Sequence, residues 1–368
     1  MTHTYGGSIK PVMIGDLLIE IPIIQGAMGV RISKSKLVSA VSQQGAMGVI
    51  ASVGLGDETE SMYEYTKKSN EALRDEIQKT RQNTNNPFGV NILVALSNYE
   101  SLCQVCVEEK VSAIFSGAGL PLNLPECVGT KEVKLVPIVS SAKAAHVIIK
   151  YWRKKYDRLP DAFVVEGPLA GGHLGFSRQE LDAPPLLTSL VRDVRAFLDS
   201  DENLKHIPII AAGGIYSVED IREVLQAGAQ AVQMATRFIT THECDAPDVV
   251  KQACLAAKEE DVILVNSPVG LPGRVLRNDF VTRILNKEKI RFSCPYKCLR
   301  TCKQYESDFC IAQALVNAFQ GNLDEGFIMP GYNVFKLDKI ISVQELIEEL
   351  LPGFITHGST VSRSVHAK

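Results

Sequence analysis

Residues 164–176 read VVEGPLAGGHLGF, and this stretch decides the fold. Two β-branched residues and a carboxylate lead into four glycines that surround a single histidine, His173. Glycine is unfavourable inside a regular helix or strand and useful where the backbone turns sharply or closely approaches a ligand. The stretch therefore predicts a strand that ends in a tight loop, which holds a ligand and one imidazole.

A second glycine pair follows the next apolar run. Residues 208–215 read PIIAAGGI, a run too short for a typical helix that ends at Gly213 and Gly214. Ser217 then offers a helix N-cap, and the next strand, which starts at residue 231, ends at Ala235 and Thr236. Backbone N–H groups at such strand ends bind phosphate well, so the two glycines, Ala235 and Thr236 predict a phosphate site.

Five further short apolar runs precede the three predicted strands described above, which begin at residues 164, 208 and 231. They cover residues 19–29, 47–52, 88–94, 113–119 and 135–141, with helical patterns over 33–45, 57–83, 99–110 and 142–156. Eight strands alternating with helices, with every glycine-rich or polar feature at a strand end, predict an α/β fold of the (β/α)8 TIM-barrel type. A doubly wound open sheet is the main competitor, but its G-x-G-x-x-G signature is not present in QGAMGV after the first strand.

Asn91 is the one polar side chain inside the third predicted strand. Strands of parallel barrels are apolar almost throughout, so a buried amide needs hydrogen-bond partners. Two interpretations stay open: Asn91 contacts a cofactor ring, or it pairs with neighbouring backbone.

Composition excludes several classes of partner. The net charge of −3 gives no electrostatic case for nucleic acid or an anionic membrane surface, and no apolar stretch is long enough to span a bilayer. The first residues show no signal peptide, and nine cysteines without one suggest reduced thiols in the cytoplasm. We therefore expect a cytoplasmic protein that acts on a small molecule; its oligomeric state stays open.

The character of the sequence changes after the eighth strand. We expect residues 1–260 to form the barrel, and residues 261–368 to form a lid and a smaller, mostly helical C-terminal portion that covers the active site. Arg274 and Arg277 lie in a segment rich in Pro and Gly. They could recognise a pyrophosphate or a carrier phosphopantetheine, or they could be solvated or paired with acidic residues.

Four cysteines stand close together in the C-terminal portion. Cys294, Cys298 and Cys302 are spaced by four and Cys310 follows, so that a helix starting at Pro295 would put the first three thiols on one face. A metal or iron–sulfur site and packing in a helical core are both open interpretations. Helical spacing is not the C-x2-C pattern of zinc ribbons, so we assign no metal ligands.

These motifs in combination resemble one family. PIIQGAMG, VNIL, EGPLAGGHLG, PIIAAGGI and QMATRF follow each other as in the flavin-dependent nitronate monooxygenases, formerly called 2-nitropropane dioxygenases. The resemblance covers roughly residues 11–280. The same superfamily contains the FMN-dependent enoyl-acyl-carrier-protein reductase of the second type.

The resemblance implies a barrel that holds FMN, and it carries roles to individual residues. Gly26, Ala27 and Met28 would lie against the isoalloxazine, and Asn91 would contact the ring system. Gly171 and Gly172 would border the phosphate-side loops. His173 matches the family's catalytic histidine. The phosphate would be held by Gly213, Gly214, Ala235 and Thr236.

The activity implied is oxidation of alkyl nitronates by O2 to a carbonyl compound and nitrite. His173 would act either as a protonated group that binds the anion or as a neutral base. The alternative is a reductase that uses NAD(P)H and FMN on an enoyl thioester of acyl carrier protein, or an NADH:quinone reductase. A protein that only binds FMN is a third interpretation, disfavoured by the presence of His173.

Overall fold

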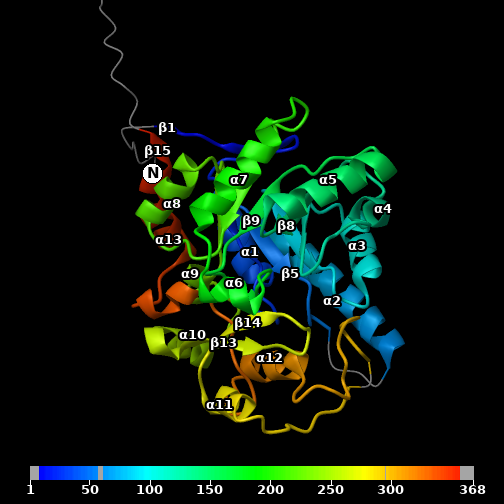
Figure 1. Ribbon diagram of the computed structural model, residues 1–368, viewed down its shortest axis with the longest axis vertical. Coiled ribbons are helices and arrows are strands. Elements are labelled where there is room, and N and C mark those ends of the chain that lie inside the picture. Colours follow the sequence, from blue (N-terminus) through cyan, green and yellow to red (C-terminus); the bar gives the residue numbers. More distant parts are fainter. Residues whose placement is uncertain (1–7, 57–60, 295, 357–368) are drawn as a thin grey trace, which may run out of the picture.

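The computed structural model describes residues 8–56, 61–294 and 296–356, and all structural statements concern these residues. Eight short parallel strands form one sheet in the order β4-β12-β11-β9-β8-β7-β6-β5 (Figure 1). These strands are β4 (Ile23–Gln25), β5 (Gly48–Ala51), β6 (Phe88–Leu93), β7 (Ala113–Gly117), β8 (Lys134–Val139), β9 (Phe163–Glu166), β11 (Ile209–Ala212) and β12 (Ala231–Met234).

The two end strands of this sheet meet at Met47. Its N–H donates to the carbonyl oxygen of Ile23 over 3.0 Å, and its carbonyl accepts from the N–H of Gln25 over 2.8 Å. Ile24 and Met47 form a parallel bridge between these two bonds. The sheet is thereby closed into a barrel, and the predicted fold class is confirmed.

The strand predicted over residues 19–29 is wrong in extent. Its first residue belongs to a hairpin of β2 (Val12–Ile14) and β3 (Leu17–Ile19), and only β4 joins the barrel. Ile14 and Ile19 of this hairpin belong to the same buried cluster as Ile24 and Phe115 of the barrel. An apolar run does not reveal where a chain changes its pairing partner, so the hairpin was not predicted.

Helices follow the strands and cover the outside of the barrel. Figure 1 shows α7 and α8 on one side of the barrel and α3, α4 and α5 on another. The predicted N-cap at Ser217 is confirmed, because its hydroxyl accepts from the N–H of Asp220 over 3.2 Å. The helices to this point are α1 (Ser35–Gln43), α2 (Met62–Asn83), α3 (Tyr99–Glu108), α4 (Leu124–Val128), α5 (Ala142–Tyr156), α6 (Arg178–Asp182), α7 (Leu187–Asp199), α8 (Val218–Gln226), α9 (Thr236–Ile239) and α10 (Asp248–Leu255). Residues 57–60 of the helical pattern expected over 57–83 lie outside the described residues.

The chain beyond residue 258 adds a small sheet and further helices. β13 (Val262–Asn266) and β14 (Pro272–Leu276) form a hairpin, and β10 (Gly172–His173) pairs with β14. The final strand, β15 (Ile355–Thr356), pairs with β1 (Ser8–Ile9). The helices of this part are η1 (Glu259–Asp261), α11 (Asp279–Leu285), α12 (Ile311–Phe319), η2 (Tyr332–Lys336), α13 (Val343–Leu350) and η3 (Leu351–Phe354). Residues 357–368 of the expected C-terminal portion lie outside the described residues.

The helix expected through the C-terminal cysteines is wrong. Pro295, its predicted first residue, lies outside the described residues, but Cys294 and residues 296–310 contain no helix. Backbone bonds to another loop hold this segment instead: the N–H of Arg300 donates to the carbonyl of Ala95 over 2.8 Å, and Leu299 bridges Leu96. These contacts with a distant loop outweigh the helical pattern that the spacing of the cysteines suggested.

Within the part of the chain that the structure describes, no helix is both long and apolar enough to cross a membrane.

Candidate functional site

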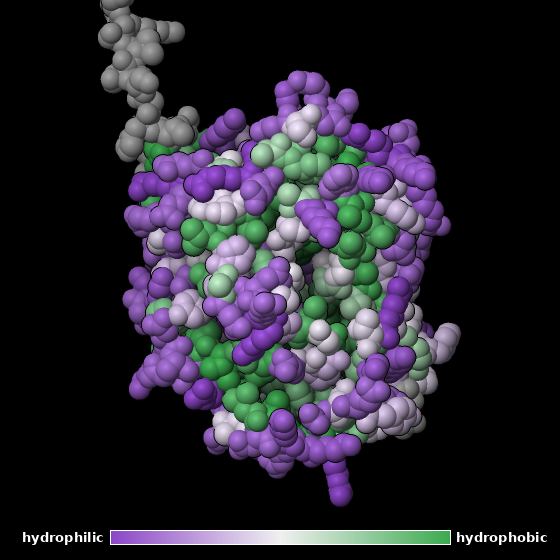
Figure 2. All heavy atoms as spheres, in the orientation of Figure 1, coloured by the Kyte–Doolittle hydropathy of each residue, from purple (hydrophilic) through white to green (hydrophobic). Residues whose placement is uncertain are grey.

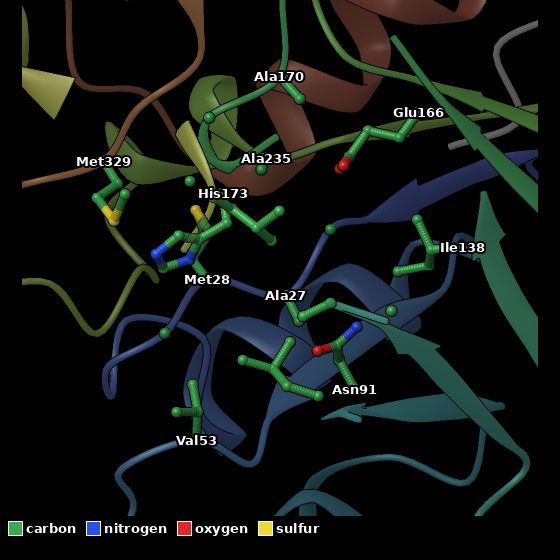
Figure 3. A pocket seen from close by; sticks show the side chains of 18 of the residues that line it. Ala27, Met28, Val53, Asn91, Ile138, Glu166, Ala170, His173, Ala235 and Met329 are labelled. Carbon is green, nitrogen blue, oxygen red and sulfur yellow. The ribbon is translucent and has the colours of Figure 1, made fainter. Parts of the chain in front are cut away.

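One large cavity, of about 1170 Å³, opens at the carboxyl ends of the barrel strands. All the residues predicted to bind FMN or act on substrate line it: Gly26, Ala27, Met28, Asn91, Gly171, Gly172, His173, Gly213, Gly214, Ala235 and Thr236. Figure 3 shows Ala27, Met28, Asn91, His173 and Ala235 around this space. Figure 2 shows that the face in view is hollowed near its centre, with apolar residues around the hollow. The fold thus brings the predicted site residues together, whereas their roles stay predictions.

A buried polar pair holds the loop after β4 in place. The Gln25 side chain donates to the carbonyl of Gly26 over 2.6 Å and to the hydroxyl of Ser33 over 2.9 Å. The same hydroxyl accepts from the N–H of Met28 over 2.9 Å. Since both polar side chains are fully buried, these bonds fix a loop of small residues as one wall of the cavity.

The predicted phosphate side is built from two distant parts of the chain. Gly213 and Gly214 have φ of 91° and 96°, a backbone conformation that favours glycine. The hydroxyl of Thr236 accepts from the N–H of Gly331 over 2.8 Å, and the Asn333 amide donates to the carbonyl of Gly214 over 2.6 Å. Residues 329–333 therefore cover this side.

Gly171 packs directly beneath the same segment. A Cβ atom added to it would lie 2.5 Å from the carbonyl oxygen of Met329 and 2.6 Å from the nitrogen of Gly331. Such distances are shorter than real carbon contacts, so the backbone of the cover can approach only a glycine here.

His173 is positioned by strand pairing rather than by a flexible loop. In β10 it stands opposite Gly273 of β14, and its Nε2 lies 2.7 Å from the hydroxyl of Ser267, which is buried between β13 and β14. Burial lowers the pKa of the imidazole from 6.5 to about 4. The ring is therefore neutral at physiological pH.

Hydrogen bonds from Arg274 hold the loop that leads to His173. Its buried guanidinium donates to the carbonyl oxygens of Pro168, over 2.7 Å, and Ala170. It also lies over the ring of Tyr332, 5.7 Å from the centroid. Burial lowers the pKa of Arg274 to about 10. The guanidinium is thus engaged by backbone carbonyls rather than by acidic residues, and the recognition of a pyrophosphate stays a prediction.

Glu166 places a carboxyl group in the cavity at the end of β9 (Figure 3). Among the described residues, none forms a hydrogen bond or ion pair with this carboxyl group that would offset its burial, and burial raises its pKa to about 7. A carboxyl group with this environment in a cavity is available to a bound ligand.

Asn91 also faces the cavity with its side-chain amide (Figure 3). The partners of this residue within the barrel are backbone ones: its carbonyl accepts from the N–H and the hydroxyl of Ser52, over 3.1 and 2.7 Å. The described residues give the amide itself no partner, which favours the ligand-contact interpretation over pairing with neighbouring backbone.

These features fit a flavin. The walls near β4 and β12 carry small residues, and a Cβ added to Gly26 would meet the side chains of Gln233 and Ala235 at 3.2 and 3.4 Å. Unpartnered polar groups of Asn91 and Glu166 face the space, and it is large enough for both a flavin and a substrate.

Three residues of the site escaped sequence reasoning: Ser267, Gly331 and Asn333. Ser267 precedes a turn of the segment SPVGLPG, and Gly331 and Asn333 stand in PGYN, so both stretches carried the signal of a turn. Nothing in the sequence indicated that these turns reach His173 and Thr236.

Comparisons with known proteins agree with the fold and the cavity. The sequence model described as nitronate monooxygenase matches residues 10–102 and 96–353. A probable nitronate monooxygenase of Staphylococcus aureus is 28% identical over 302 residues, which cover 74% of this chain and 79% of that protein. A (3aS,4S,5R,7aS)-5-hydroxy-7a-methyl-1-oxo-octahydro-1H-indene-4-carboxyl-CoA dehydrogenase of Mycobacterium tuberculosis is 26% identical over 377 residues, 94% and 96% of the two chains.

Among solved structures, FabK from Thermotoga maritima is 30% identical with a TM-score of 0.71, covering 91% of this chain and 93% of that one. Nitroalkane oxidase from Streptomyces ansochromogenes also reaches a TM-score of 0.71, over 91% and 96% of the chains, at 22% identity. The latter likeness concerns the fold alone.

Proposed function

Because the chain belongs to the nitronate monooxygenase family and is a flavin-dependent oxidoreductase, we propose that it oxidises alkyl nitronates with O2 to a carbonyl compound and nitrite. The observation that carries this proposal is a neutral, half-buried imidazole, His173, held by Ser267 at the wall of a large cavity. The flavin in this proposal is FMN, and it supplies the oxidation chemistry when bound.

His173 acts as a base in this scheme. A pKa of about 4 leaves the ring unprotonated between pH 5 and 8, so it can accept a proton but does not offer a positive charge to an anion. With a neutral nitroalkane, the imidazole removes the α-proton and generates the nitronate in place. With a nitronate supplied as such, no proton has to be removed.

The hydroxyl of Ser267 orients the base. It can donate to an unprotonated Nε2 or accept from a protonated one, so it accommodates the proton in either tautomer. The pairing of β10 with β14 fixes the backbone of the same histidine. Both constraints reduce the reorganisation needed for proton transfer.

The cofactor would be held by groups from five barrel strands, β4, β6, β9, β11 and β12, and the loops that follow them. Gly26, Ala27 and Met28 would lie against the ring system, and Asn91 would contact it. Gly171 and Gly172 would border the phosphate-side loops, and Gly213, Gly214, Ala235 and Thr236 would hold the phosphate. The contacts of Gly331 with Thr236 and of Asn333 with Gly214 support this assignment, because they keep the two loops together. Among the described residues after 260, the segments 266–272 and 328–333, which line the cavity, would serve as the lid.

The test compares two substrates in the flavin-loaded enzyme. Propyl nitronate should change the flavin spectrum anaerobically and yield nitrite once air is admitted. A His173→Ala variant should lose about 10²–10⁴-fold of its turnover with 1-nitropropane, the range for a lost general base, and much less with propyl nitronate. Equal losses with both substrates would contradict the assignment as a base, and no nitrite from either would contradict the monooxygenase.

A second candidate is reduction of an enoyl thioester by NAD(P)H and FMN, with acyl carrier protein as a partner. The 30% identity to FabK and a relative named as a CoA-ester dehydrogenase favour it, as does a cavity whose far wall carries the apolar side chains of Ile311 and Leu315. Rapid anaerobic bleaching of the flavin by NADH or NADPH, with none by nitronate, would select this reaction. Subsequent oxidation by a quinone but not by an enoyl thioester would select NADH:quinone reduction.

A further inference from the structure

The carboxyl group of Glu166 has no role in the reaction proposed above. It stands at the end of β9, and its side chain points into the cavity (Figure 3). Glu166 pairs with Ala212 of β11, and the preceding Val165 pairs with Val139 of β8. Both flanking strands end in uncharged residues, so neither offers a positive charge to an ionised Glu166.

The ionisable groups around Glu166 leave its carboxyl uncompensated. The other ionisable side chains that line the cavity are Tyr65, His173, Arg178, Tyr216, Tyr296 and Cys298. The helix α7 packs against β9, and its charged residues are Arg192, Asp193, Arg195 and Asp199. Among the described residues, no charged group shifts the pKa of Glu166, and burial alone raises it to about 7.

The barrel places Glu166 across its mouth from two residues predicted to contact the flavin ring. In the closed order of strands, β9 is separated from β4 by β11 and β12, and from β6 by β8 and β7. Ala27 follows β4 and Asn91 lies in β6, so these two residues and Glu166 come from three well-separated points on one ring of strands. Figure 3 shows the three side chains around a common space. A planar ring in this space is therefore flanked by the carboxyl group as well as by the amide.

The carboxyl group has different chemistry in its two charge states. When ionised it only accepts hydrogen bonds, whereas the protonated form also donates one. The edge of an oxidised flavin ring carries carbonyl oxygens and unprotonated nitrogens, which are acceptors, so only the protonated form can donate to them. A flavin that covers the carboxyl group also excludes water from it, which disfavours the charged form further.

We propose that Glu166 contacts the flavin as a neutral carboxylic acid, which donates a hydrogen bond to an acceptor atom of the isoalloxazine ring. Flavin binding is then coupled to protonation, because the complex keeps the proton that the flavin-free chain loses above about pH 7. The affinity for flavin should be highest at and below neutral pH, and should fall about tenfold for each pH unit above it. This inference rests on the flavin of the proposed function, and not on the nitronate as substrate.

The test measures FMN binding to the flavin-free full chain by fluorescence between pH 7 and pH 8.5. The second pKa of a phosphate monoester is about 6, so the phosphate of FMN no longer titrates in this range. We expect the Kd of the wild type to rise roughly tenfold from the lower to the higher pH. Calorimetry at pH 8.5, in two buffers of different ionisation enthalpy, should show the uptake of about one proton for each FMN bound.

Two variants separate the charge of Glu166 from its hydrogen bond. Glu166→Gln keeps the size and a donor but cannot ionise, so its Kd should change by less than about twofold over the range, with no proton uptake. Glu166→Leu removes both polar atoms. It should bind FMN about tenfold more weakly than Glu166→Gln at both pH values, the loss expected for one hydrogen bond.

Asp245→Asn is the matched control. Asp245 is half-buried like Glu166, and burial raises its pKa too. Its carboxylate does not line the cavity, and it accepts hydrogen bonds from the N–H groups of Lys34 and Leu37 at the start of α1. This variant should therefore keep the pH dependence of the wild type.

The binding data decide this proposal without any turnover. It is overturned by a wild-type affinity that does not fall with pH, by an equal fall in Glu166→Gln, or by a Glu166→Leu variant that binds as tightly as Glu166→Gln. A chain that binds FMN with the expected pH dependence but yields no nitrite would contradict the monooxygenase and support the contact of Glu166. Nitrite formation with an affinity for FMN that is independent of pH would do the reverse.

Discussion

The Nε2 atom of His173 lies 2.7 Å from the hydroxyl oxygen of Ser267, a residue 94 positions later in the chain. Two independent constraints therefore act on one imidazole: the pairing of β10 with β14 fixes its backbone, and a buried hydroxyl fixes its ring.

Replacing Ser267 by Ala should lower kcat with a nitroalkane about tenfold, because a net hydrogen bond of about 1–1.5 kcal/mol no longer orients the base. Flavin affinity should not change. Steady-state kinetics and a flavin titration check this, with Ser267→Thr as the control that keeps a hydroxyl. A variant with normal kcat would show that the ring is oriented without Ser267.

The half-buried imidazole of His173 should make the flavin-free protein sensitive to mild acid. The pKa of His173 is about 4 in the folded chain and 6.5 when unfolded, so between these values the unfolded state binds the extra proton. Stability is lost as pH falls from 6.5 to 4, by up to about 3 kcal/mol. Urea unfolding should therefore show that the free energy of unfolding of His173→Asn, relative to that of the wild type, is higher at pH 4.5 than at pH 8. A difference between the two proteins that is the same at both pH values would refute the pKa shift.

Glu166 should act in the opposite direction. Its pKa is raised from 4.5 to about 7, so the folded state holds a proton that the unfolded state has lost, and stability falls as pH rises through this interval. Glu166→Gln should stabilise the flavin-free protein by about 1–3 kcal/mol at pH 8 and by little at pH 4. Thermal unfolding at both pH values measures this. A gain that is equal at the two values would mean that ionisation is not its cause.

Thr236→Ala should weaken FMN binding by at least about tenfold, since it removes a hydroxyl from the predicted phosphate side and leaves the N–H of Gly331 unpaired. Thr236→Ser keeps the hydroxyl and should bind normally. Fluorescence titration of the flavin-free protein gives both constants. Unchanged affinity in the alanine variant would contradict the assignment of Thr236 to the phosphate.

Arg274→Met should destabilise the protein by about 2–4 kcal/mol, because it leaves the buried carbonyls of Pro168 and Ala170 without a donor. Arg178→Met, at the exposed rim of the same cavity, is the matched control and should cost little. Urea unfolding compares the two. Similar free energies of unfolding for the two variants would show that the loop before His173 is stable without the hydrogen bonds from Arg274.

The barrel fold, and the residues at the carboxyl ends of its strands, could be predicted from local sequence patterns. Short apolar runs that end in glycine or small polar residues indicate parallel strands, and a barrel necessarily brings their carboxyl ends together. For this reason His173, Asn91 and Gly213 could be expected in one cavity, and they do line it.

What the sequence did not reveal depends on contacts between distant segments. Ser267 reaches His173 through the pairing of β10 with β14, and Gly331 reaches Thr236 across 95 positions. The four-residue spacing of the cysteines pointed to a helix, yet the described residues of that segment form turns and backbone bonds to the loop at residues 95–97 instead. Local patterns contain no information on such partners.

The cover formed by residues 329–333 imposes an order on biosynthesis. The last barrel strand ends at Met234, whereas Gly331, which closes over Thr236, leaves the ribosome 95 positions after that threonine. At ordinary rates of translation this interval lasts on the order of ten seconds. During it the nascent barrel presents an open, partly apolar rim, and stable loading of the cofactor must wait until residues 329–333 have been synthesised.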